Sequence, residues 1–469
     1  MRVALLPVII LPYTLCSVAH ASAQSCKVRP PNIVFILADD LGWRELGAYG
    51  NRFNETPNLD RLAAEGFTFM QAYAAAPVCS PSRAAFMTGQ YPGRIGLTNY
   101  LEKDDRNYLR PEYTTINELL SRAGYRTALI GKWHLTGDYE AGPDRKGLGR
   151  PQLHGWDEVI ASETVYIGPG DYFYPYFFLP DLGQRAPEFT GRKPDEPEYL
   201  TDRLNAEAVE FIRRNRERPF FLYLSHYSVH TQLVGKPELL RKYQRKPESG
   251  TNSRGEYNHP MLAAMLESID DGVGQIMRTL DEFGLAENTL IVFTSDNGGE
   301  FGVTTMAPLW GGKSMVYEGG LRVPTIMRWP GKVPRGVKSD VATITADYFP
   351  TFLEAAGAKP DARQPVDGIS LMPLFKGGGS LRRDTLYWHY PLPKPRPLAA
   401  RSSGAIRRGV YKLIEFFDTG EVELYNLRED IGEQWNLAAR NQRKVAELRS
   451  ALREWRQRAK VSMRPMREY

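Results

Sequence analysis

Cysteine is scarce in this chain of 469 residues, which contains only Cys16, Cys26 and Cys79. Exported proteins that depend on cross-links carry more cysteines, in even numbers, so these three exclude a disulfide framework. Two of them lie close to the N-terminus, ahead of the first predicted strand. Cys79 is therefore expected to serve a purpose other than cross-linking.

Long apolar runs are lacking after the N-terminus, so no stable membrane span is expected. The N-terminus itself combines a positive start, an apolar run from Val3 to Val18 that prolines interrupt, and the small-x-small site Ala21–Ala23. This pattern predicts a signal peptide over residues 1–23, cleaved near Ala23, and export to the periplasm or the medium. A membrane anchor and a lipidated Cys26 remain as alternatives.

A strong excess of one charge is also absent, because 60 Lys and Arg face 55 Asp and Glu for a net charge of +5. The two signs are interspersed and no basic repeat occurs, so a nucleic-acid partner is not expected. Hydrophobic content of 42% and charged content of 25% are typical of globular proteins. The length favours more than one domain, or a large domain with an appendage.

Short apolar runs bounded by polar residues predict buried parallel strands, and helical patterns lie between them. We expect an α/β fold over residues 24–364, in which a large, mostly parallel or mixed sheet lies between helices. From about residue 365, short strand-like runs and a helix near Gln442–Lys460 predict a smaller subdomain. We expect residues 365–469 to form a small antiparallel sheet with a terminal helix.

Polar side chains follow four of these predicted strands: Asp39 and Asp40, Lys132 and His134, His226 and His230, and Asp296 and Asn297. Ligands gather at the carboxyl ends of strands in open α/β sheets, so the four groups are expected to form one site. Adjacent carboxylates repel unless a cation lies between them, which suggests Ca²⁺ or Mg²⁺. Taken singly, the acids could be helix caps, and Lys132 and His134 could share a face of an edge strand.

The pentapeptide Cys79-Ser80-Pro81-Ser82-Arg83 opens a predicted helix. Pro81 suits the first turn, where its missing N–H is not needed. The free N–H groups there favour an anion, and Arg83 lies one turn further along the same face. A buried thiol in a capped helix is the alternative when this stretch is taken alone.

These motifs together resemble the formylglycine-dependent type I sulfatases of the alkaline phosphatase superfamily, in particular the bacterial carbohydrate sulfatases. The resemblance covers nearly the whole chain after the signal peptide. It is carried by Ala38–Gly42, Cys79–Arg83 with Thr88-Gly89, Gly124–Thr127, Gly131–His134, Ser295–Gly298, Gly312-Lys313 and Tyr317–Gly320.

The resemblance implies that a maturation enzyme oxidises Cys79 to formylglycine, whose hydrate is the nucleophile. It also implies one Ca²⁺ per site, held by Asp39, Asp40, Asp296, Asn297 and the modified residue 79. Arg83 and Lys132 would hold the hydrate and the sulfate, His134 would orient a hydroxyl, Lys313 would bind sulfate and His230 would assist the leaving alcohol. The family commonly has prolines around this histidine and the chain does not, so His226 stays open as the alternative to His230.

The resemblance implies hydrolysis of a sulfate monoester, with a sulfated saccharide such as a galactose or N-acetylgalactosamine sulfate as substrate. A phosphate or phosphonate ester hydrolase on the same scaffold is the alternative activity. A non-catalytic protein that binds sulfated glycans is the alternative from another class. Aromatic residues at 172–178 and Tyr387–Tyr390 are candidates for sugar-stacking walls, or for ordinary core packing.

Overall fold

The computed structural model describes residues 29–466, except 103–104, 138–147, 161–171, 175, 177–197, 252–256, 305, 377–378 and 394–399. The predicted signal peptide and Cys26 lie outside the described residues. Within them, no helix is both long enough and apolar enough to cross a membrane.

A nine-stranded mixed sheet forms the centre of the larger unit within the described residues. Strands β1, β3, β5 and β8 are parallel, so all four carboxyl ends lie at the same edge of the sheet. Strand β9 is antiparallel to both β8 and β2, which makes the sheet mixed. Its strands, in spatial order, are β10 (Val337–Ser339), β2 (Phe67–Tyr73), β9 (Arg322–Arg328), β8 (Thr289–Ser295), β1 (Asn32–Ala38), β5 (Phe220–Ser225), β3 (Arg126–Gly131) and β4 (Glu158–Ile160), and β11 (Thr343–Ile344) also pairs with β2.

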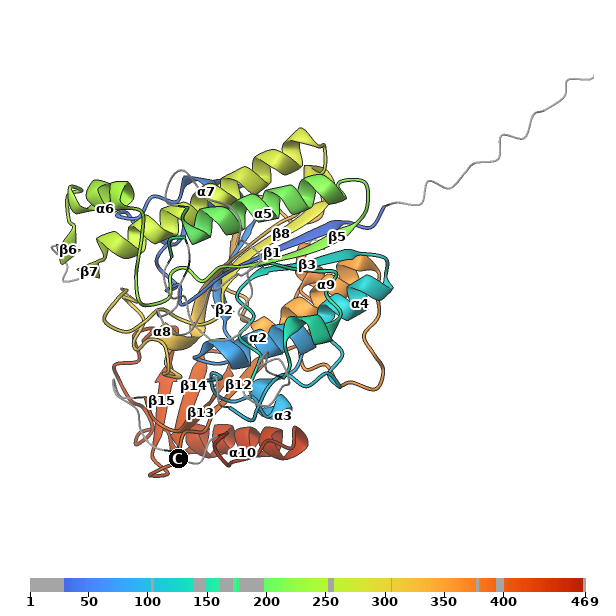
Figure 1. The fold of residues 1–469 in the computed structure, drawn as a ribbon. Coiled ribbons are helices and arrows are strands. Elements are labelled where there is room, and N and C mark those ends of the chain that lie inside the picture. Colours follow the sequence, from blue (N-terminus) through green and yellow to red (C-terminus); the bar gives the residue numbers. More distant parts are fainter. Residues whose placement is uncertain are drawn as a thin grey trace, which may run out of the picture.

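Helices cover both faces of this sheet, as Figure 1 shows. One face packs against α1, α5 and α7, and the other against α2, α4 and α9. The strands are apolar on both faces because both faces are covered. The helices are α1 (Pro57–Ala64), α2 (Cys79–Thr88), α4 (Ile116–Arg122), α5 (Leu200–Asn215), α7 (Pro260–Glu282) and α9 (Tyr348–Ala356), with the shorter α3 (Pro92–Ile95), α6 (Pro237–Gln244) and α8 (Glu318–Leu321). A hairpin of β6 (Gly250–Thr251) and β7 (Tyr257–Asn258) follows α6.

The C-terminal part forms a second, antiparallel sheet of β12 (Thr385–Tyr390), β13 (Ser403–Arg408), β14 (Tyr411–Phe416) and β15 (Val422–Asn426). Helix α10 (Gln442–Arg458) packs on it, below the large sheet in the view of Figure 1. The predicted fold class is therefore confirmed. The sequence reasoning did not place β2 and β13.

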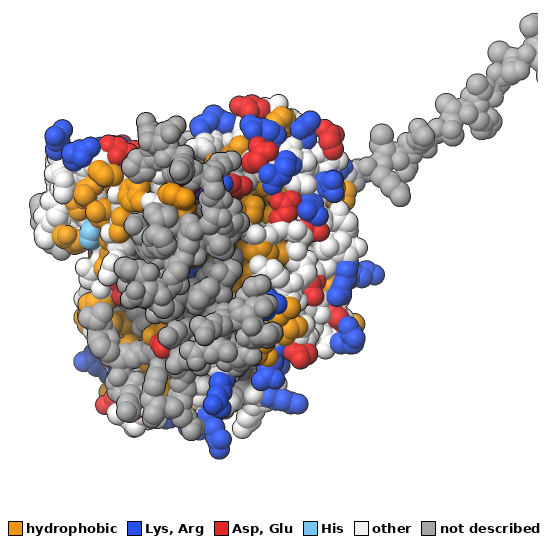
Figure 2. Space-filling model, viewed as in Figure 1, with side chains coloured by type: hydrophobic (Ala, Val, Ile, Leu, Met, Phe, Trp, Pro, Cys, Tyr) orange, Lys and Arg blue, Asp and Glu red, His pale blue; other side chains and the backbone are white. Residues whose placement is uncertain are grey.

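Both signs of charge are interspersed over the described part of the face that Figure 2 shows. Large hydrophobic side chains are exposed at few described positions, which are Leu153, Tyr257, Phe301, Trp310, Trp435 and Met463. Phe301 and Trp310 lie in the segment that follows β8.

Candidate active site

The parallel strands bring the acidic residues of the predicted site together. Ala38 at the end of β1 is in register with Ser295 at the end of β8, so the residues that follow each strand are neighbours. The backbone N–H of Asp40 donates to Asp296 Oδ1 at 3.2 Å. Asn297 Nδ2 donates to Asp40 Oδ1 at 2.7 Å. Residues more than 250 positions apart thus form one buried cluster.

Cys79 occupies the first turn of α2 and points at this cluster. Its Sγ lies 3.6 Å from Asp39 Oδ1 and 4.0 Å from Asp40 Oδ1, and the side chain is buried. Burial raises the pKa of the thiol well above its ordinary value, although Lys132 opposes the shift. The residue is therefore a neutral thiol and not an activated thiolate.

Arg83 lies one turn further along α2 and is fully engaged with the site. Its Nε and Nη2 donate to Asp296 Oδ2 at 2.9 and 2.7 Å. Its Nη1 donates to Ser225 Oγ at 2.7 Å and to the carbonyl of Lys132 at 3.0 Å. The guanidinium therefore joins α2 to the ends of β3, β5 and β8.

Two lysines complete the ring of cations around the carboxylates. Lys132 Nζ lies 2.6 Å from Asp39 Oδ2, and Lys313 Nζ lies 2.6 Å from Asp40 Oδ2. Burial disfavours both charges, yet the paired carboxylates keep the pKa of each lysine above its ordinary value. With Arg83, three cations face three carboxylates in this part of the chain.

His134 differs from the sequence prediction in its backbone. Strand β3 ends at Gly131, and His134 has a φ of 57°, so Lys132 and His134 are not alternate residues of an extended strand. The expectation that they share a strand face is wrong, because the left-handed residue turns the chain. Its Nε2 lies 3.0 Å from the carbonyl oxygen of Leu101. Burial, together with Lys132 and Arg83, holds the pKa of His134 well below its usual range.

The two candidate histidines after β5 occupy different environments. His230 Nε2 lies 3.0 Å from Lys313 Nζ and 3.5 Å from Asp40 Oδ2, at the open side of the cluster. His226 is 1% exposed, and neither ring nitrogen has a hydrogen-bond partner among the described residues. Burial lowers the pKa of both imidazoles to about 3, and Lys313 adds to the effect on His230. The geometry thus brings His230 to the site and leaves His226 aside.

The acidic cluster fits a hard cation. Asp39, Asp40, Asp296 and Cys79 each offer an atom within 4.8 Å of the others. Asn297 Oδ1 is buried and has no hydrogen-bond partner among the described residues, which is costly unless a cation or donor satisfies it. Burial and the neighbouring carboxylates raise the pKa of Asp39 to about 7, although Lys132 opposes this. These oxygen donors suit Ca²⁺ or Mg²⁺.

Sequence reasoning missed three parts of this site. Ser225 Oγ and the Leu101 carbonyl position Arg83 and His134, and nothing in the local sequence marks either contact. Glu300 Oε2 lies 3.7 Å from Lys313 Nζ. Glu300 directly follows Asn297-Gly298-Gly299 after the end of β8, and this position in the sequence could have marked it as a site residue.

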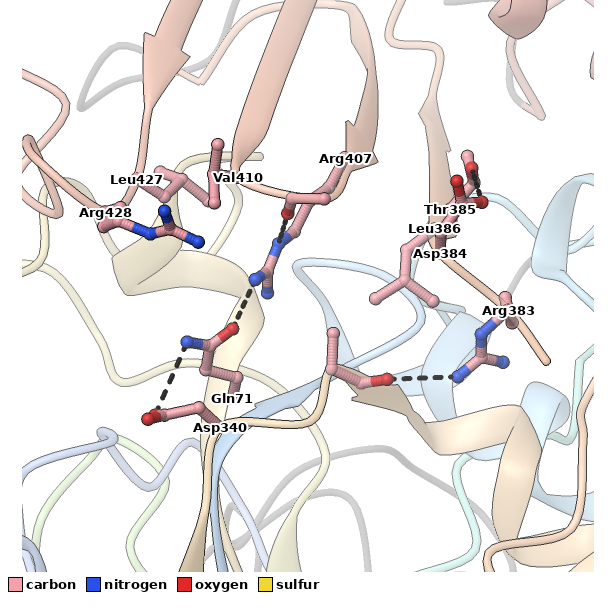
Figure 3. Close-up of a pocket in the computed structure, with 12 residues that line it drawn as sticks. Gln71, Asp340, Arg383, Asp384, Thr385, Leu386, Arg407, Val410, Leu427 and Arg428 are labelled. Carbon is pink, nitrogen blue, oxygen red and sulfur yellow. Dashed lines mark hydrogen bonds between the residues drawn. The ribbon is translucent and has the colours of Figure 1, made fainter. Parts of the chain in front are cut away.

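A separate hollow of about 540 Å³ lies between the large sheet and the C-terminal sheet, shown in Figure 3. Arg407 at its wall donates to Gln71 and to Tyr73 Oη, and Arg383 donates to both carboxylate oxygens of Asp347. None of the predicted site residues lines this hollow. Arg407 therefore joins β13 of the C-terminal sheet to β2 of the large sheet.

Comparison with known proteins agrees with this geometry. The family model described as Sulfatase matches residues 31–358, and the model described as N-sulphoglucosamine sulphohydrolase, C-terminal, matches residues 308–460. The fold and site define a hydrolase of the alkaline phosphatase superfamily. The chain belongs to the sulfatase family, and it is a sulfuric ester hydrolase.

Individual relatives act on different sulfate esters. The chain is 35% identical to N-acetylgalactosamine-6-sulfatase of Homo sapiens, over 77% of this chain and 68% of that protein. It is 34% identical to steryl-sulfatase of Rattus norvegicus, over 78% of this chain and 74% of that protein. The crystal structure of Ps i-CgsB in complex with k-i-k-neocarrahexaose is 31% identical, with a TM-score of 0.76 over 91% of this chain and 93% of that one.

Proposed function

We propose that residue 79 becomes formylglycine and that its hydrate hydrolyses the sulfate ester of a saccharide. The observation that carries this is the position of Cys79, whose Sγ lies beside Asp39 and Asp40 within the ring of cations. A neutral, buried thiol is a poor nucleophile, so the position calls for another chemical group. In maturation, the Cβ–S bond of residue 79 would be replaced by a C=O bond: sulfur leaves as hydrogen sulfide, and the two electrons pass to molecular oxygen at the maturation enzyme.

Formylglycine offers, when hydrated, two hydroxyls on one carbon, so that one can attack sulfur and the other can later expel sulfate. Arg83 keeps α2 and Asp296 in place while this happens, through its donors to Asp296 and Ser225. His134, neutral and buried, is suited to orient one hydroxyl. An ordinary serine or cysteine has only one such group and could not release sulfate in this way.

We propose Asp39, Asp40, Asp296, Asn297 and the modified residue 79 as ligands of one Ca²⁺. The unpartnered Asn297 Oδ1 and the raised pKa of Asp39 support this assignment. Bound calcium would supply positive charge next to the sulfate oxygens. Arg83, Lys132 and Lys313 face the carboxylates of Asp39, Asp40, Asp296 and Glu300, so the two positive charges of the added ion leave the site with a net positive charge that favours an anionic ester.

Lys132 and Lys313 are proposed to bind the non-bridging oxygens of sulfate, where negative charge gathers during transfer. His230 is proposed as the group that protonates the leaving alcohol, because it lies beside Lys313 on the open side of the site. An anionic ester placed between them would offset the charge of Lys313, which contributes to the low pKa of His230. The imidazole would then hold a proton more readily.

A saccharide is proposed as the alcohol part of the substrate, with galactose and N-acetylgalactosamine sulfates as the first compounds to test. The relatives that act on N-acetylgalactosamine sulfate or bind neocarrahexaose support this class. Export to the periplasm or the medium, as the N-terminal pattern predicts, would bring the enzyme to such polymers.

Two measurements test the proposal. Mass spectrometry of the peptide that contains residue 79, after co-expression with a formylglycine-generating enzyme, should show the aldehyde in place of the thiol. Turnover of 4-nitrophenyl sulfate should then exceed turnover of 4-nitrophenyl phosphate. Unmodified cysteine in an active preparation would refute the nucleophile, and faster phosphate hydrolysis would refute the ester class.

A further inference from the structure

Two exposed aromatic side chains lie on the segments that adjoin Lys313. Trp310 is 51% exposed and Phe301 is 37% exposed, although both belong to residue types that are mostly buried. Their ring centroids lie 6.2 Å apart at an interplanar angle of 79°, an edge-to-face pair. The ring of Tyr317 also contacts the indole of Trp310, with ring centroids 6.5 Å apart.

The backbone around Lys313 fixes this pair at the edge of the site. The N–H of Lys313 donates to the carbonyl of Gly299 at 2.8 Å, and a Cβ on Gly312 would lie only 3.2 Å from Phe301 Cβ. Phe301 therefore packs against the residue that precedes Lys313. The carbonyl of Trp310 accepts from the N–H of Gly319 at 2.7 Å, which holds the other end of the loop.

The carboxylate of Glu300 lies next to the aromatic pair and next to Lys313, the residue proposed to bind sulfate. Glu300 directly precedes Phe301, is accessible to solvent, and lies 3.7 Å from Lys313 Nζ. Burial raises the pKa of Glu300, although the charge of Lys313 opposes the shift. Aromatic faces contact the C–H face of a pyranose, and a carboxylate accepts hydrogen bonds from sugar hydroxyls. This combination matches a sugar better than a steroid, because the fused rings of a steroid offer Glu300 no row of hydroxyl donors beyond its contact with Lys313.

None of the other described aromatic candidates is as exposed as Phe301 and Trp310, since Phe173, Tyr174 and Tyr387 are partly buried against the hydrophobic cores. Trp388 and Tyr390 are buried in the core beneath the C-terminal sheet, and Tyr172 and Tyr176 are buried as well. Residues 175, 177 and 178 lie outside the described residues. The aromatic surface next to Lys313 therefore comes from a part of the chain that sequence reasoning did not select.

We propose that Glu300, Phe301 and Trp310 form a saccharide subsite beside the sulfate position and select sulfated sugars over other sulfate esters. The inference rests on the proposed function, because it requires a sulfate ester to be bound at Lys313. Hydrophobic contact with the two rings and hydrogen bonds to Glu300 would orient the sugar so that its ester oxygen faces His230.

The test compares Trp310→Ala, Phe301→Ala and Trp310→Phe with the wild-type enzyme. For a sulfated galactose or N-acetylgalactosamine oligosaccharide, we expect each alanine variant to raise KM about tenfold, since an aromatic contact contributes about one factor of ten. Trp310→Phe should recover most of the loss. The turnover number on 4-nitrophenyl sulfate should stay within about twofold, because the rings do not take part in bond cleavage.

Met463→Ala is the control, since Met463 is an exposed hydrophobic residue, 49% accessible, in the segment that follows α10. It should leave KM for the oligosaccharide unchanged. An unchanged KM in Trp310→Ala would overturn the subsite, and so would an equal loss of turnover on 4-nitrophenyl sulfate, which would indicate a structural role. Failure of the wild-type enzyme to hydrolyse any sulfate ester would instead refute the proposed function.

Discussion

Lys412 Nζ lies 2.9 Å from Glu318 Oε1 and 2.9 Å from Glu433 Oε1, and all three side chains are buried. Lys412 belongs to β14 of the C-terminal sheet, whereas Glu318 begins α8, five residues after Lys313. The backbone N–H of Glu318 also donates to Glu433 Oε2 at 2.7 Å. The C-terminal subdomain thus holds the loop that carries a proposed sulfate-binding lysine.

Replacing Lys412 with methionine should destabilise the protein strongly. The variant leaves Glu318 and Glu433 buried without their shared cation, and such a loss costs about 3–5 kcal/mol. Urea unfolding followed by fluorescence measures the change. Lys444→Met is the control, because Lys444 pairs with Glu447 near the surface and should contribute less than about 1 kcal/mol. Equal effects of the two substitutions would contradict the assigned role of Lys412.

Glu433 should make stability depend on pH. Burial raises its pKa from 4.5 to about 7, with the Glu318 carboxylate adding to the shift and Lys412 opposing it. At pH values between 4.5 and about 7, Glu433 keeps its proton in the folded protein but has released it in the unfolded chain. Its contribution to the free energy of unfolding therefore falls as pH rises through this range. Glu433→Gln mimics the protonated side chain, so the stability of this variant should not fall with pH through this group.

Thermal unfolding at pH 5, 6, 7 and 8 checks this expectation through the difference in Tm between the variant and the wild type. That difference should shift in favour of the variant as pH rises to about 7 and then level off. Other buried acids, including Asp39, titrate in both proteins and cancel in the difference. A constant difference would show that Glu433 is ionised throughout.

His230 should matter most when the leaving alcohol is a poor one. His230→Asn is expected to lower kcat about a hundredfold on a sulfated sugar and far less on 4-nitrophenyl sulfate, whose phenolate leaves without a proton. His226→Asn is the matched control, since His226 follows the same strand, β5, but has no hydrogen-bond partner among the described residues and does not reach Lys313. Steady-state kinetics on both substrates decide between the two histidines. A selective loss in His226→Asn would reverse the assignment.

Removal of calcium should lower both activity and stability. Dialysis against EGTA should abolish turnover, and Ca²⁺ at a hundred times its dissociation constant should raise Tm by roughly 3 °C over the apo protein. Asn297→Ala should need more Ca²⁺ for the same Tm shift, because it removes the unpartnered Oδ1. A Tm that does not respond to Ca²⁺ or Mg²⁺ would refute the metal site.

Much of the fold could be predicted because its signals are local. The runs that form β1, β5 and β8 are apolar through their middle and polar only near their ends, as expected of buried parallel strands, and the structure confirms them. Strand β2 was missed because Phe67–Tyr73 contains Thr68 and Gln71 and lacks a clear period. Its place in the sheet depends on pairing with β9, which lies about 250 residues later.

The sequence by itself determined the sulfatase motifs, the buried strands β1, β3, β5 and β8 and the residue types gathered at their carboxyl ends. Those features follow from short-range patterns and from the rule that parallel strands end at one edge. Only the tertiary structure brought His230 rather than His226 to Lys313, and only it exposed Trp310 and Phe301. These outcomes depend on contacts between distant segments, whose packing no local pattern encodes.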